Sequence, residues 1–331
     1  MKRALVVSAP GRANLIGNPT DIYGGAVLSC SVDLRARVRL ETADAWILAT
    51  EGTTCEIRSE RDLAVRGDLF DVARAVLAHV GTLRPACRIE YASQIPLRSG
   101  LAGSTALVVS LLHALGAWRG RTLGPYELAE TARRIELSLL EVVCGYVDHY
   151  MCTFGGLRYL DFRGKGIDRS DGEPPFATVE PLERCAPGLP FVLGFTGVQH
   201  SSGAVHSPIR ERWLAGDPEV VAGYDRVSEI ARLGKRAFLA GDFERLGALM
   251  NENHAIQRDF GGSGESNERL IAAARAGGAL GAKLAGAGNG GTIVALCHEA
   301  GIARVEAALR AAGVAALYRP TVTPGVTVEG A

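Results

Sequence analysis

The chain has 331 residues, of which 47% are hydrophobic and 22% are charged, and its 36 basic and 36 acidic residues leave no formal net charge. These proportions are typical of a soluble globular enzyme, and the length favours two domains over a single core. The balanced charge lacks the basic footprint of a nucleic-acid-binding protein. No apolar run is uninterrupted over the roughly 20 residues that span a bilayer, so we expect no membrane segment and a cytoplasmic location.

The seven cysteines are scattered along the chain, without a CxxC pair or a histidine partner at zinc-finger spacing. This usage is typical of reduced core cysteines in a cytoplasmic protein. The first residues, MKRALVVSAPGR, contain an apolar run that is too short for the core of a signal peptide, and we interpret it as the first strand.

The first hundred residues are predicted to form strands and then a helix. Alternating apolar and polar positions dominate residues 3–60, and helical spacing over residues 69–80 predicts an amphipathic helix. Alternation returns over residues 88–95, and Pro96 ends this half-buried strand.

A glycine-rich bend, IPLRSGLAGSTA, joins that strand to a long apolar helix that we expect to begin near Ser104 or Thr105. The first turn of a helix carries backbone N–H groups without intrahelical partners and a partial positive charge, so it suits an anion. Gly100 and Gly103 would let a phosphate approach the backbone. An isolated bend of this kind more often only shapes a tight turn, so the phosphate interpretation needs support from elsewhere in the chain.

The remainder of the chain mixes helical and strand-like spacing. Helices are predicted at residues 126–143, 218–239, 243–258 and 266–276, and strands at 156–162 and 191–198. Ser266 is the expected cap of the last of these helices. A cluster of proline and glycine at residues 185–190 is the expected joint between two domains. The chain then reads GAKLAGAGNGGTIVALC, which is two short apolar runs around another glycine-rich bend.

Three glycine-rich segments therefore lie far apart in the chain: PGRANLIGNPTDIYGG, PLRSGLAGSTA and LAGAGNGG. We call them the first, middle and third motifs, and together they are more specific than any one of them. The chain has no GxxxxGK[ST] P-loop sequence. Gly286, Gly288 and Gly291 satisfy GxGxxG, but a strand-like run follows them instead of a helix, so we interpret that match as accidental.

With these motifs in this order, nearly the whole chain resembles the GHMP kinases, the superfamily of galactokinase, homoserine kinase, mevalonate kinase and phosphomevalonate kinase. The resemblance implies an α+β fold in two domains. An N-terminal ribosomal-protein-like domain would span residues 1–186, and a C-terminal ferredoxin-like domain would span residues 187–331. It also implies ATP and Mg²⁺ as cofactors, bound with a small-molecule acceptor in the cleft between the domains.

The resemblance assigns the phosphates of ATP to the middle motif, which the third motif steadies. The nucleotide-binding residues implied are Pro96, Arg98, Ser99, Gly100, Leu101, Ala102, Gly103, Ser104, Thr105, Gly286 and Gly288. Ser104 falls where the family's loop serine coordinates Mg²⁺, and Glu136 falls where a helical glutamate completes the metal site. One hydroxyl and one carboxylate suit Mg²⁺, which prefers oxygen ligands, although a helical glutamate is by itself usually a solvated residue.

Asp148 falls at the family's catalytic aspartate, where it would take the proton of the acceptor hydroxyl, a contribution of about 10²–10⁴ in rate. Arg12 would neutralise charge on the transferred phosphoryl group. The acceptor-binding residues implied are Asn18, Asp21, Tyr23, Gly24, Gly25 and Asp148. His149, His200 and His206 are given no catalytic role, because histidines near a site are often structural donors.

The chain departs from the family pattern at four positions. Ala102, Gly103 and Thr105 stand where many members have glycine, serine and alanine, and Asn289 stands at a position that is usually glycine. The lost loop serine puts one hydroxyl contact in doubt. Asparagine tolerates the left-handed backbone better than most residues, so the turn of the third motif can persist.

The acceptor is predicted from three runs, IGNPTD, SGLAGSTA and SGAVHSPIRERWLAGD, which are most similar to the glucuronokinase branch. That branch phosphorylates the anomeric hydroxyl of D-glucuronate. The run IELSLLEVVCGYVDHYMCTFGG also resembles heptose-7-phosphate kinases. Both acceptors carry an anionic group, for which Arg98, Arg210 and Arg212 are candidates that the sequence does not rank.

Two further alternatives stay open from the sequence. One is another sugar 1-kinase of the superfamily, and the other is a sensor that binds sugar and nucleotide without catalysing transfer. We expect a monomer or a homodimer with small-molecule partners.

Overall fold

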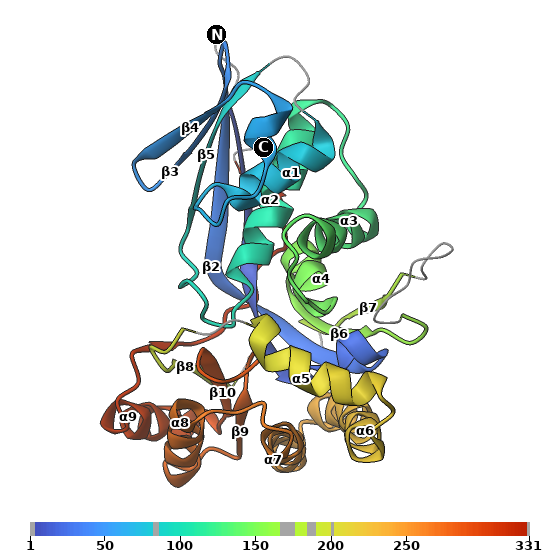
Figure 1. The fold of residues 1–331 in the computed structure, drawn as a ribbon. Helices are drawn as coiled ribbons and strands as arrows, with labels where there is room; N and C mark the ends of the chain where they lie inside the picture. The colour runs from blue at the N-terminus through green and yellow to red at the C-terminus, as the bar shows by residue number, and fades with distance from the viewer. Residues whose placement is uncertain (1–3, 82–85, 166–175, 184–189, 200–201, 330–331) are drawn as a thin grey trace.

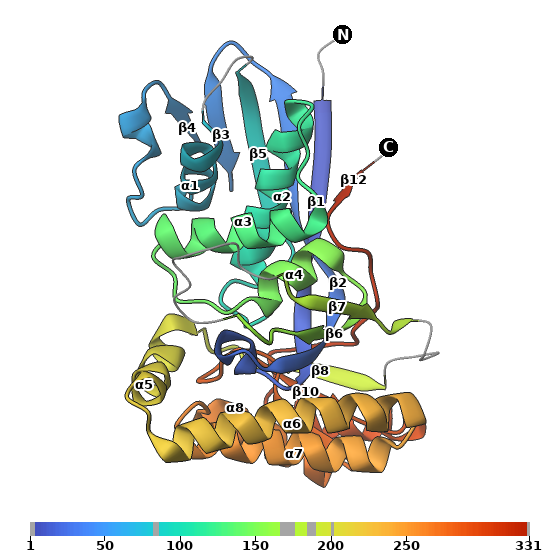
Figure 2. The ribbon, with the colours of Figure 1, turned by 90° about the vertical axis from the view of Figure 1, so that its right-hand side faces the viewer.

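The computed structural model describes residues 4–81, 86–165, 176–183, 190–199 and 202–329. Within this part of the chain, two separate β-sheets each carry their own helices (Figures 1 and 2). The expected α+β organisation in two parts is therefore confirmed. The expected joint at residues 185–190 and the boundary after residue 186 lie outside the described residues, except for Pro190.

The larger sheet is formed mainly by the N-terminal half of the chain and has the order β12-β1-β2-β5-β3-β4, with β6 pairing β2 and β7 pairing β6. Its strands are β1 (Ala4–Ile16), β2 (Ala26–Thr42), β3 (Trp46–Thr50), β4 (Thr53–Ile57), β5 (Cys87–Ser93), β6 (Leu157–Asp161), β7 (Thr178–Pro181) and β12 (Thr327–Val328). The long strand β2 pairs with β5 near one end and with β6 near the other, so it connects the two halves of this sheet.

Helices cover one face of the larger sheet (Figure 1). They are η2 (Glu60–Leu63), α1 (Asp71–Val80), α2 (Gly103–Trp118), α3 (Pro125–Ser138) and α4 (Val147–Phe154). The short helix η1 (Thr20–Tyr23) lies in the connection between β1 and β2 and contacts α6 (Pro218–Ala240). Helix α2 packs against β1, β2 and three neighbouring helices, and its buried residues lie on nearly all its sides. Helix α2 is therefore a core element, and its N-terminus is held at a fixed place beside β1.

The smaller sheet has the order β11-β8-β10-β9, with all pairs antiparallel. Its strands are β8 (Phe191–Phe195), β9 (Gly281–Leu284), β10 (Thr292–Leu296) and β11 (Ala316–Tyr318). The accompanying helices are α5 (Ser202–Leu214), α6 (Pro218–Ala240), α7 (Phe243–Asp259), α8 (Glu265–Ala276), η4 (Glu299–Gly301) and α9 (Ile302–Ala311). Helices follow the first and third of these strands, and the first strand lies between the third and the fourth. This is the ferredoxin-like arrangement that was expected.

The last described strand returns to the first sheet. Val7 and Ser8 of β1 pair with β12, and the side chain of Arg35 in β2 donates hydrogen bonds to the backbone of Pro324 and Gly325. The segment after β11 thus packs on the N-terminal half of the chain. The smaller sheet and its helices therefore do not include the last described residues.

Two predicted helix boundaries were wrong. The helix expected over residues 126–143 ends at Ser138, because Glu141 adopts a left-handed backbone with φ of 53° and the chain folds back over α3. Helix α8 begins at Glu265 after an extended Gly264, so Ser266 lies inside the helix and does not cap it. A Cβ atom at Gly264 would lie 2.9 Å from Oδ1 of Asn289, so contact with the third motif fixes this helix start.

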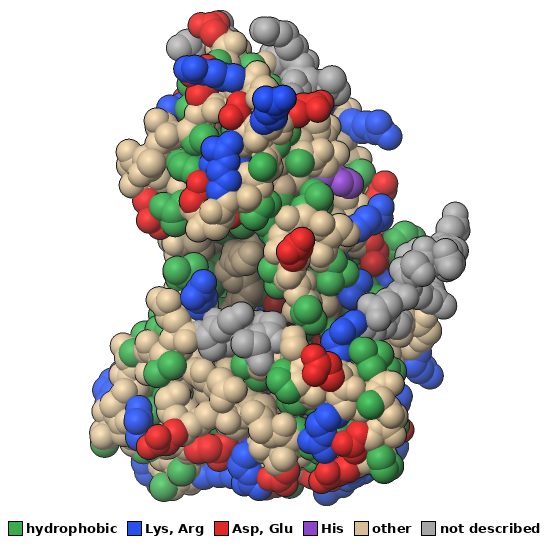
Figure 3. Space-filling model, in the orientation of Figure 1, with side chains coloured by type: hydrophobic (Ala, Val, Ile, Leu, Met, Phe, Trp, Pro, Cys, Tyr) green, Lys and Arg blue, Asp and Glu red, His purple; other side chains and the backbone are tan. Residues whose placement is uncertain are grey.

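The described residues include no helix that is both long and apolar enough to cross a bilayer. Basic and acidic side chains are interspersed over the face shown in Figure 3, in agreement with the balanced composition. The six described cysteines carry free thiols, and of these Cys55 and Cys144 are half-buried while the others are buried. Cys185 lies outside the described residues.

Candidate active site

The middle motif forms a tight loop between β5 and α2 whose shape comes from backbone conformation. Arg98, Gly100 and Ala102 all have positive φ, at 52°, 73° and 63°. Helix α2 begins at Gly103, directly after Ala102 and one or two positions before the expected start. This reversal of the chain leaves the first-turn N–H groups of α2 at the end of the loop, where they lack intrahelical partners. The loop therefore has the backbone geometry of an anion cradle.

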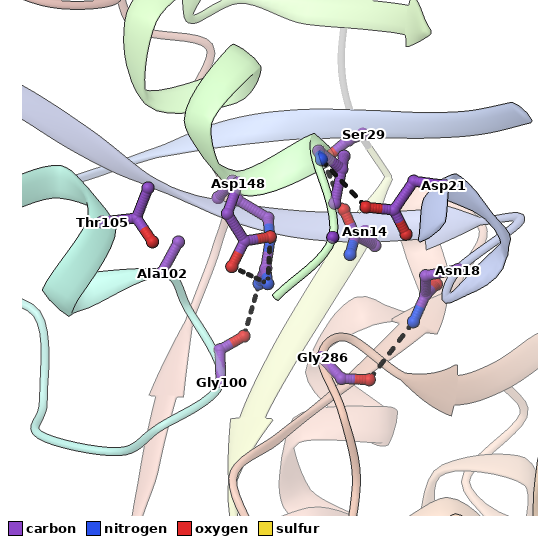
Figure 4. Close-up of polar contacts among 12 residues, drawn as sticks. Asn14, Asn18, Asp21, Ser29, Gly100, Ala102, Thr105, Asp148 and Gly286 are labelled. Atoms are coloured by element: carbon purple, nitrogen blue, oxygen red, sulfur yellow. Dashed lines mark hydrogen bonds and ion pairs between the residues drawn. The ribbon is translucent and has the colours of Figure 1, made fainter. Parts of the chain in front are cut away.

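Arg12 and Asp148 form a bidentate ion pair beside this loop. Figure 4 shows Asp148 close to Gly100 of the loop. Nε of Arg12 donates to Oδ1 of Asp148 and Nη2 donates to Oδ2, each at 2.7 Å. The remaining nitrogen, Nη1, donates to the carbonyl oxygen of Gly100. The Arg12 side chain is 7% exposed and the Asp148 side chain 27% exposed, so the carboxylate can be reached from outside. The guanidinium of Arg12 thus links Asp148, the other expected catalytic residue, to the phosphate loop.

Asp21 holds the helix that carries Asp148. Its Oδ2 accepts hydrogen bonds from the backbone N–H groups of Tyr146 and Val147, at 2.7 and 2.9 Å, where α4 begins. Burial raises the pKa of the Asp21 carboxyl, and these two N–H groups oppose the rise. A Cβ atom at Gly145 would lie 2.0 Å from Oδ2, so glycine is required there. One carboxylate oxygen of Asp21, an expected acceptor-binding residue, is therefore already hydrogen-bonded to the backbone of the protein.

Glu136 lies in a buried network with residues of α2 and α4. Ser104 and Thr105 donate their hydroxyl groups to its carboxylate at 3.1 to 3.2 Å, and Nε2 of His149 lies 2.8 Å from Oε2. The Ser104 hydroxyl and the Glu136 carboxylate lie together next to the phosphate loop, and this pair of oxygen donors fits Mg²⁺. Because His149 and Thr105 orient the carboxylate, a metal held there would meet it in a fixed position.

The third motif packs against the phosphate loop. A Cβ atom at Gly286 would lie only 2.6 Å from the carbonyl oxygen of Gly100, and the Thr292 hydroxyl donates to the carbonyl of Ser99 at 2.9 Å. Gly288 has φ of 106° and faces the carbonyl of Gly262. Asn289 has φ of 53°, the left-handed conformation that its residue type permits. These contacts support a steadying role for the third motif.

Asn18 connects the first motif to the third. Its amide nitrogen donates to the carbonyl of Gly286 at 3.2 Å, and Nζ of Lys283 donates to its side-chain oxygen (Figure 4 shows the first contact). Lys283 is buried on β9, and burial together with the charge of Arg12 lowers its pKa to about 7. The side chain expected to contact the acceptor therefore also joins the two halves of the molecule.

Tyr23 lies at the end of η1 in an aromatic cluster with residues of α5 and α6. Its ring stacks on Tyr224 at a centroid separation of 4.5 Å and lies 5.0 Å from Trp213. Burial raises the pKa of the Tyr23 hydroxyl, and the contact with Tyr224 and, less strongly, the nearby charge of Arg210 oppose this. Gly24 ends η1 in the left-handed conformation. A Cβ atom at Gly25 would lie 2.3 Å from the Thr20 hydroxyl, so the two glycines shape this turn.

The structure brings the expected nucleotide, metal and catalytic residues into one region, and it adds residues that the sequence did not assign. His149 was given no catalytic role, and its position beside Glu136 makes it a structural partner of the expected metal ligand. In the sequence, the position of His149 immediately after Asp148 was the signal that could have placed it near the site. Lys283 could have been noticed because a lysine in an apolar run before the third motif needs a partner. His200 lies outside the described residues.

The sequence matches the profiles of known protein domains over much of its length. The GHMP kinases N terminal domain matches residues 65–156, and GHMP kinases C terminal matches residues 235–315. The galactokinase galactose-binding signature matches residues 1–41, which contain the first motif.

Curated relatives and solved structures cover nearly the whole chain. A mevalonate kinase from Pyrococcus furiosus is 27% identical over 346 residues, covering 98% of both proteins. Glucuronokinase 1 from Arabidopsis thaliana is 27% identical over 313 residues, covering 87% of this chain and 83% of that protein. The structure of Lactococcus lactis galactokinase complexed with galactose has a TM-score of 0.80 at 18% identity, covering 98% of this chain and 95% of that one. Its likeness shows the shared two-domain fold.

Proposed function

The chain belongs to the GHMP kinase family, and from this premise we propose that it transfers the γ-phosphoryl group of ATP to the anomeric hydroxyl of D-glucuronate. Membership of the family makes it a phosphotransferase. The proposal concerns the acceptor and the roles of individual residues.

The observation that carries the proposal is the bidentate pair of Arg12 and Asp148 at the phosphate loop. Mg-ATP supplies the phosphoryl group. Asp148 accepts the proton of the acceptor hydroxyl as the new P–O bond forms, and Arg12 fixes the orientation of its carboxylate. Because Arg12 also bonds to the carbonyl of Gly100, its positive charge lies next to the loop where negative charge develops.

The phosphates of ATP would be held by the backbone of residues 96–105 and the N-terminus of α2. Ser104 and Glu136 would hold Mg²⁺, with Thr105 and His149 orienting the carboxylate. The buried network thus contains two oxygen donors for the metal, Ser104 and Glu136, and two side chains that hydrogen-bond to the Glu136 carboxylate.

A sugar acceptor is supported by the galactose-binding signature over residues 1–41 and by the glucuronokinase relative. Arg210 and Arg212 lie on α5, whose Trp213 packs against Tyr23 of the first motif. Arg98 is exposed on the phosphate loop. Arg210 is placed so that its charge reaches the Tyr23 hydroxyl, and on this position beside the first motif we propose it as the partner of the acceptor carboxylate.

Mevalonate is the second candidate acceptor, because several archaeal mevalonate kinases are 27 to 28% identical to this chain. Mevalonate also carries a carboxylate, so Arg210 would serve either acid. Heptose 7-phosphate stays a third candidate on the resemblance of residues 135–156.

The test is an acceptor panel with purified full-length protein and Mg-ATP, comparing D-glucuronate, mevalonate, heptose 7-phosphate and D-galactose. We expect the highest kcat/KM with D-glucuronate and a product in which phosphorus NMR places the phosphate on C1. Turnover confined to mevalonate, heptose phosphate or galactose would refute the assigned acceptor.

Arg210→Met tests the proposed carboxylate contact. We expect it to raise the KM for glucuronate while leaving the KM for ATP unchanged. Arg212→Met is the matched control, since Arg212 is held by Asp217 and Glu219. Equal effects of the two variants on the KM for glucuronate would contradict the role of Arg210.

A further inference from the structure

Three metal-ligating side chains of different chemistry meet behind the phosphate loop. Glu136 of α3, Cys144 of the loop before α4 and His149 of α4 each offer a ligand atom, and these atoms all lie within 4.8 Å of one another. We call them the Glu-Cys-His cluster. We propose that this cluster binds a divalent transition-metal ion, of which Zn²⁺ is the representative.

The donor set selects the class of metal. A thiolate, an imidazole and one carboxylate are ligands of Zn²⁺ and its neighbours in the first transition row, whereas Mg²⁺ prefers oxygen atoms alone. Three protein ligands would leave a fourth position of a tetrahedral ion for water. The cluster is therefore chemically distinct from the Ser104 and Glu136 pair assigned to Mg²⁺, although Glu136 belongs to both.

The cluster is already held together without a metal. Nε2 of His149 lies 2.8 Å from Oε2 of Glu136, and both side chains are almost fully buried. Nδ1 of His149 is buried, and no hydrogen-bond partner for it is found in the described part of the chain. A metal ion held by His149 and Glu136 would take the place of this direct contact between the two side chains.

The loop that carries Cys144 allows the closure that a metal requires. For bonds of about 2.1 Å to nitrogen and 2.3 Å to sulfur, the ligand atoms of a tetrahedral ion lie about 3.5 Å apart. Ligand atoms as far apart as 4.8 Å must therefore approach by about 1 Å, while Nε2 of His149 and Oε2 of Glu136, now 2.8 Å apart, must separate slightly. Cys144 lies outside any helix or strand and is only half-buried. The backbone carbonyls of Cys144 and Gly145 accept hydrogen bonds from Arg133 of α3, so rotation of the Cys144 side chain would supply the approach of its sulfur atom.

Occupation of the cluster would withdraw Glu136 from Mg²⁺. Zn²⁺ would then inhibit the kinase by competition at a shared carboxylate. This consequence rests on the proposed function, whereas metal binding by the cluster does not.

Binding is tested with Co²⁺ as a spectroscopic probe for the zinc class, added to the metal-free full-length protein without ATP. We expect one equivalent to bind with a cobalt–thiolate charge-transfer band. Cys144→Ser should abolish the band, and Cys55→Ser, which changes the other half-buried cysteine, should retain it. His149→Gln should weaken binding by more than the roughly 10–100-fold that loss of an outer-shell contact costs.

A wild-type protein without the cobalt–thiolate band, or a Cys144→Ser variant that keeps it, would overturn the site. Thermal unfolding of each variant establishes that loss of the band is not loss of the fold. Competition of Zn²⁺ with bound Co²⁺ then measures zinc affinity without any enzymatic readout.

The inhibition is tested by assaying the kinase with increasing Zn²⁺ at several Mg²⁺ concentrations. We expect Mg²⁺ to compete with Zn²⁺, a chelator of zinc to restore activity, and Cys144→Ser to require more Zn²⁺ for the same inhibition. Cobalt binding without zinc inhibition would refute the proposal that the two metals share the Glu136 carboxylate, but the metal site itself would stand. Absence of turnover with every acceptor would refute the proposed function, and the cobalt spectrum would still decide the site.

Discussion

The phosphate loop and the acceptor side of the site are built in different ways. The loop of residues 96–105 gets its shape from the backbone of one short segment, with positive φ at Gly100 and Ala102 and a helix start directly after them. The acceptor side is assembled from side chains that are far apart in the chain, such as Arg12 and Asp148, separated by 136 positions. The loop therefore tolerates changed side chains, whereas the acceptor side depends on individual contacts.

The largest expected effect is on the acceptor side. Asp148→Asn keeps the shape of the side chain and removes the carboxylate that accepts the proton, so kcat should fall by about 10²–10⁴. The KM for ATP should change little, because the loop backbone is untouched. Steady-state kinetics with the best acceptor measure this change. ADP production at the wild-type rate would exclude phosphoryl transfer through this aspartate.

The next effect concerns Lys283, which links Asn18 to the third motif. Its pKa is lowered to about 7 in the folded protein from an ordinary value of 10.5, so between these values the unfolded chain binds more protons than the folded one. The contribution of Lys283 to stability therefore rises with pH over this window, by up to about 1.4 kcal/mol per pH unit, and is least favourable below pH 7.

Urea unfolding of the wild type and of Lys283→Met at pH 7, 8 and 9 measures this slope. We expect the stability of the wild type to increase relative to that of the variant as the pH rises. Parallel pH profiles would mean that the folded protein leaves the pKa of Lys283 at its ordinary value.

A smaller effect is expected from a change that moves the backbone of the phosphate loop. In Gly286→Ala the new methyl group would lie 2.6 Å from the carbonyl oxygen of Gly100, so the loop or the third motif must shift. Overpacking of this kind costs about 1–3 kcal/mol, and we expect kcat/KM for ATP to fall by about 5- to 150-fold. Gly301→Ala is the control, since the nearest atom to its Cβ would be 3.8 Å away. Equal kinetics for both variants would show that the third motif does not position the loop.

The smallest effect is expected for a side chain of the loop. Thr105→Ala removes hydroxyl contacts to Glu136, whose carboxylate keeps its contacts with Ser104 and His149. The loss of one such hydrogen bond is worth about 0.5–1.5 kcal/mol, so the Mg²⁺ dependence should shift by about tenfold or less. A titration of activity with Mg²⁺ measures this shift. A loss as large as that of Asp148→Asn would contradict the comparison made above, in which the backbone shapes the phosphate loop and individual side chains form the acceptor side.

The sequence by itself determined the features whose physical causes are local. The glycine pattern and apolar spacing predicted the bend before α2, and the tolerance of asparagine for positive φ predicted the turn at Asn289. The resemblance of the three motifs to the GHMP kinases implied the ferredoxin-like part, and the predicted order of strands and helices is compatible with it. Local patterns failed at Ser266 and at the end of α3, because contacts with the third motif and with the loop before α4 fix those boundaries.

Only the tertiary structure decided how distant side chains share their contacts. Asp21 supports the start of α4, His149 fixes Glu136, and Lys283 joins Asn18 to the smaller sheet. No local pattern predicts these pairs, because each depends on the relative position of elements packed through the core. Backbone preferences act over a few residues, whereas the pairing of buried polar groups is settled when the chain has packed and every such group must find a partner.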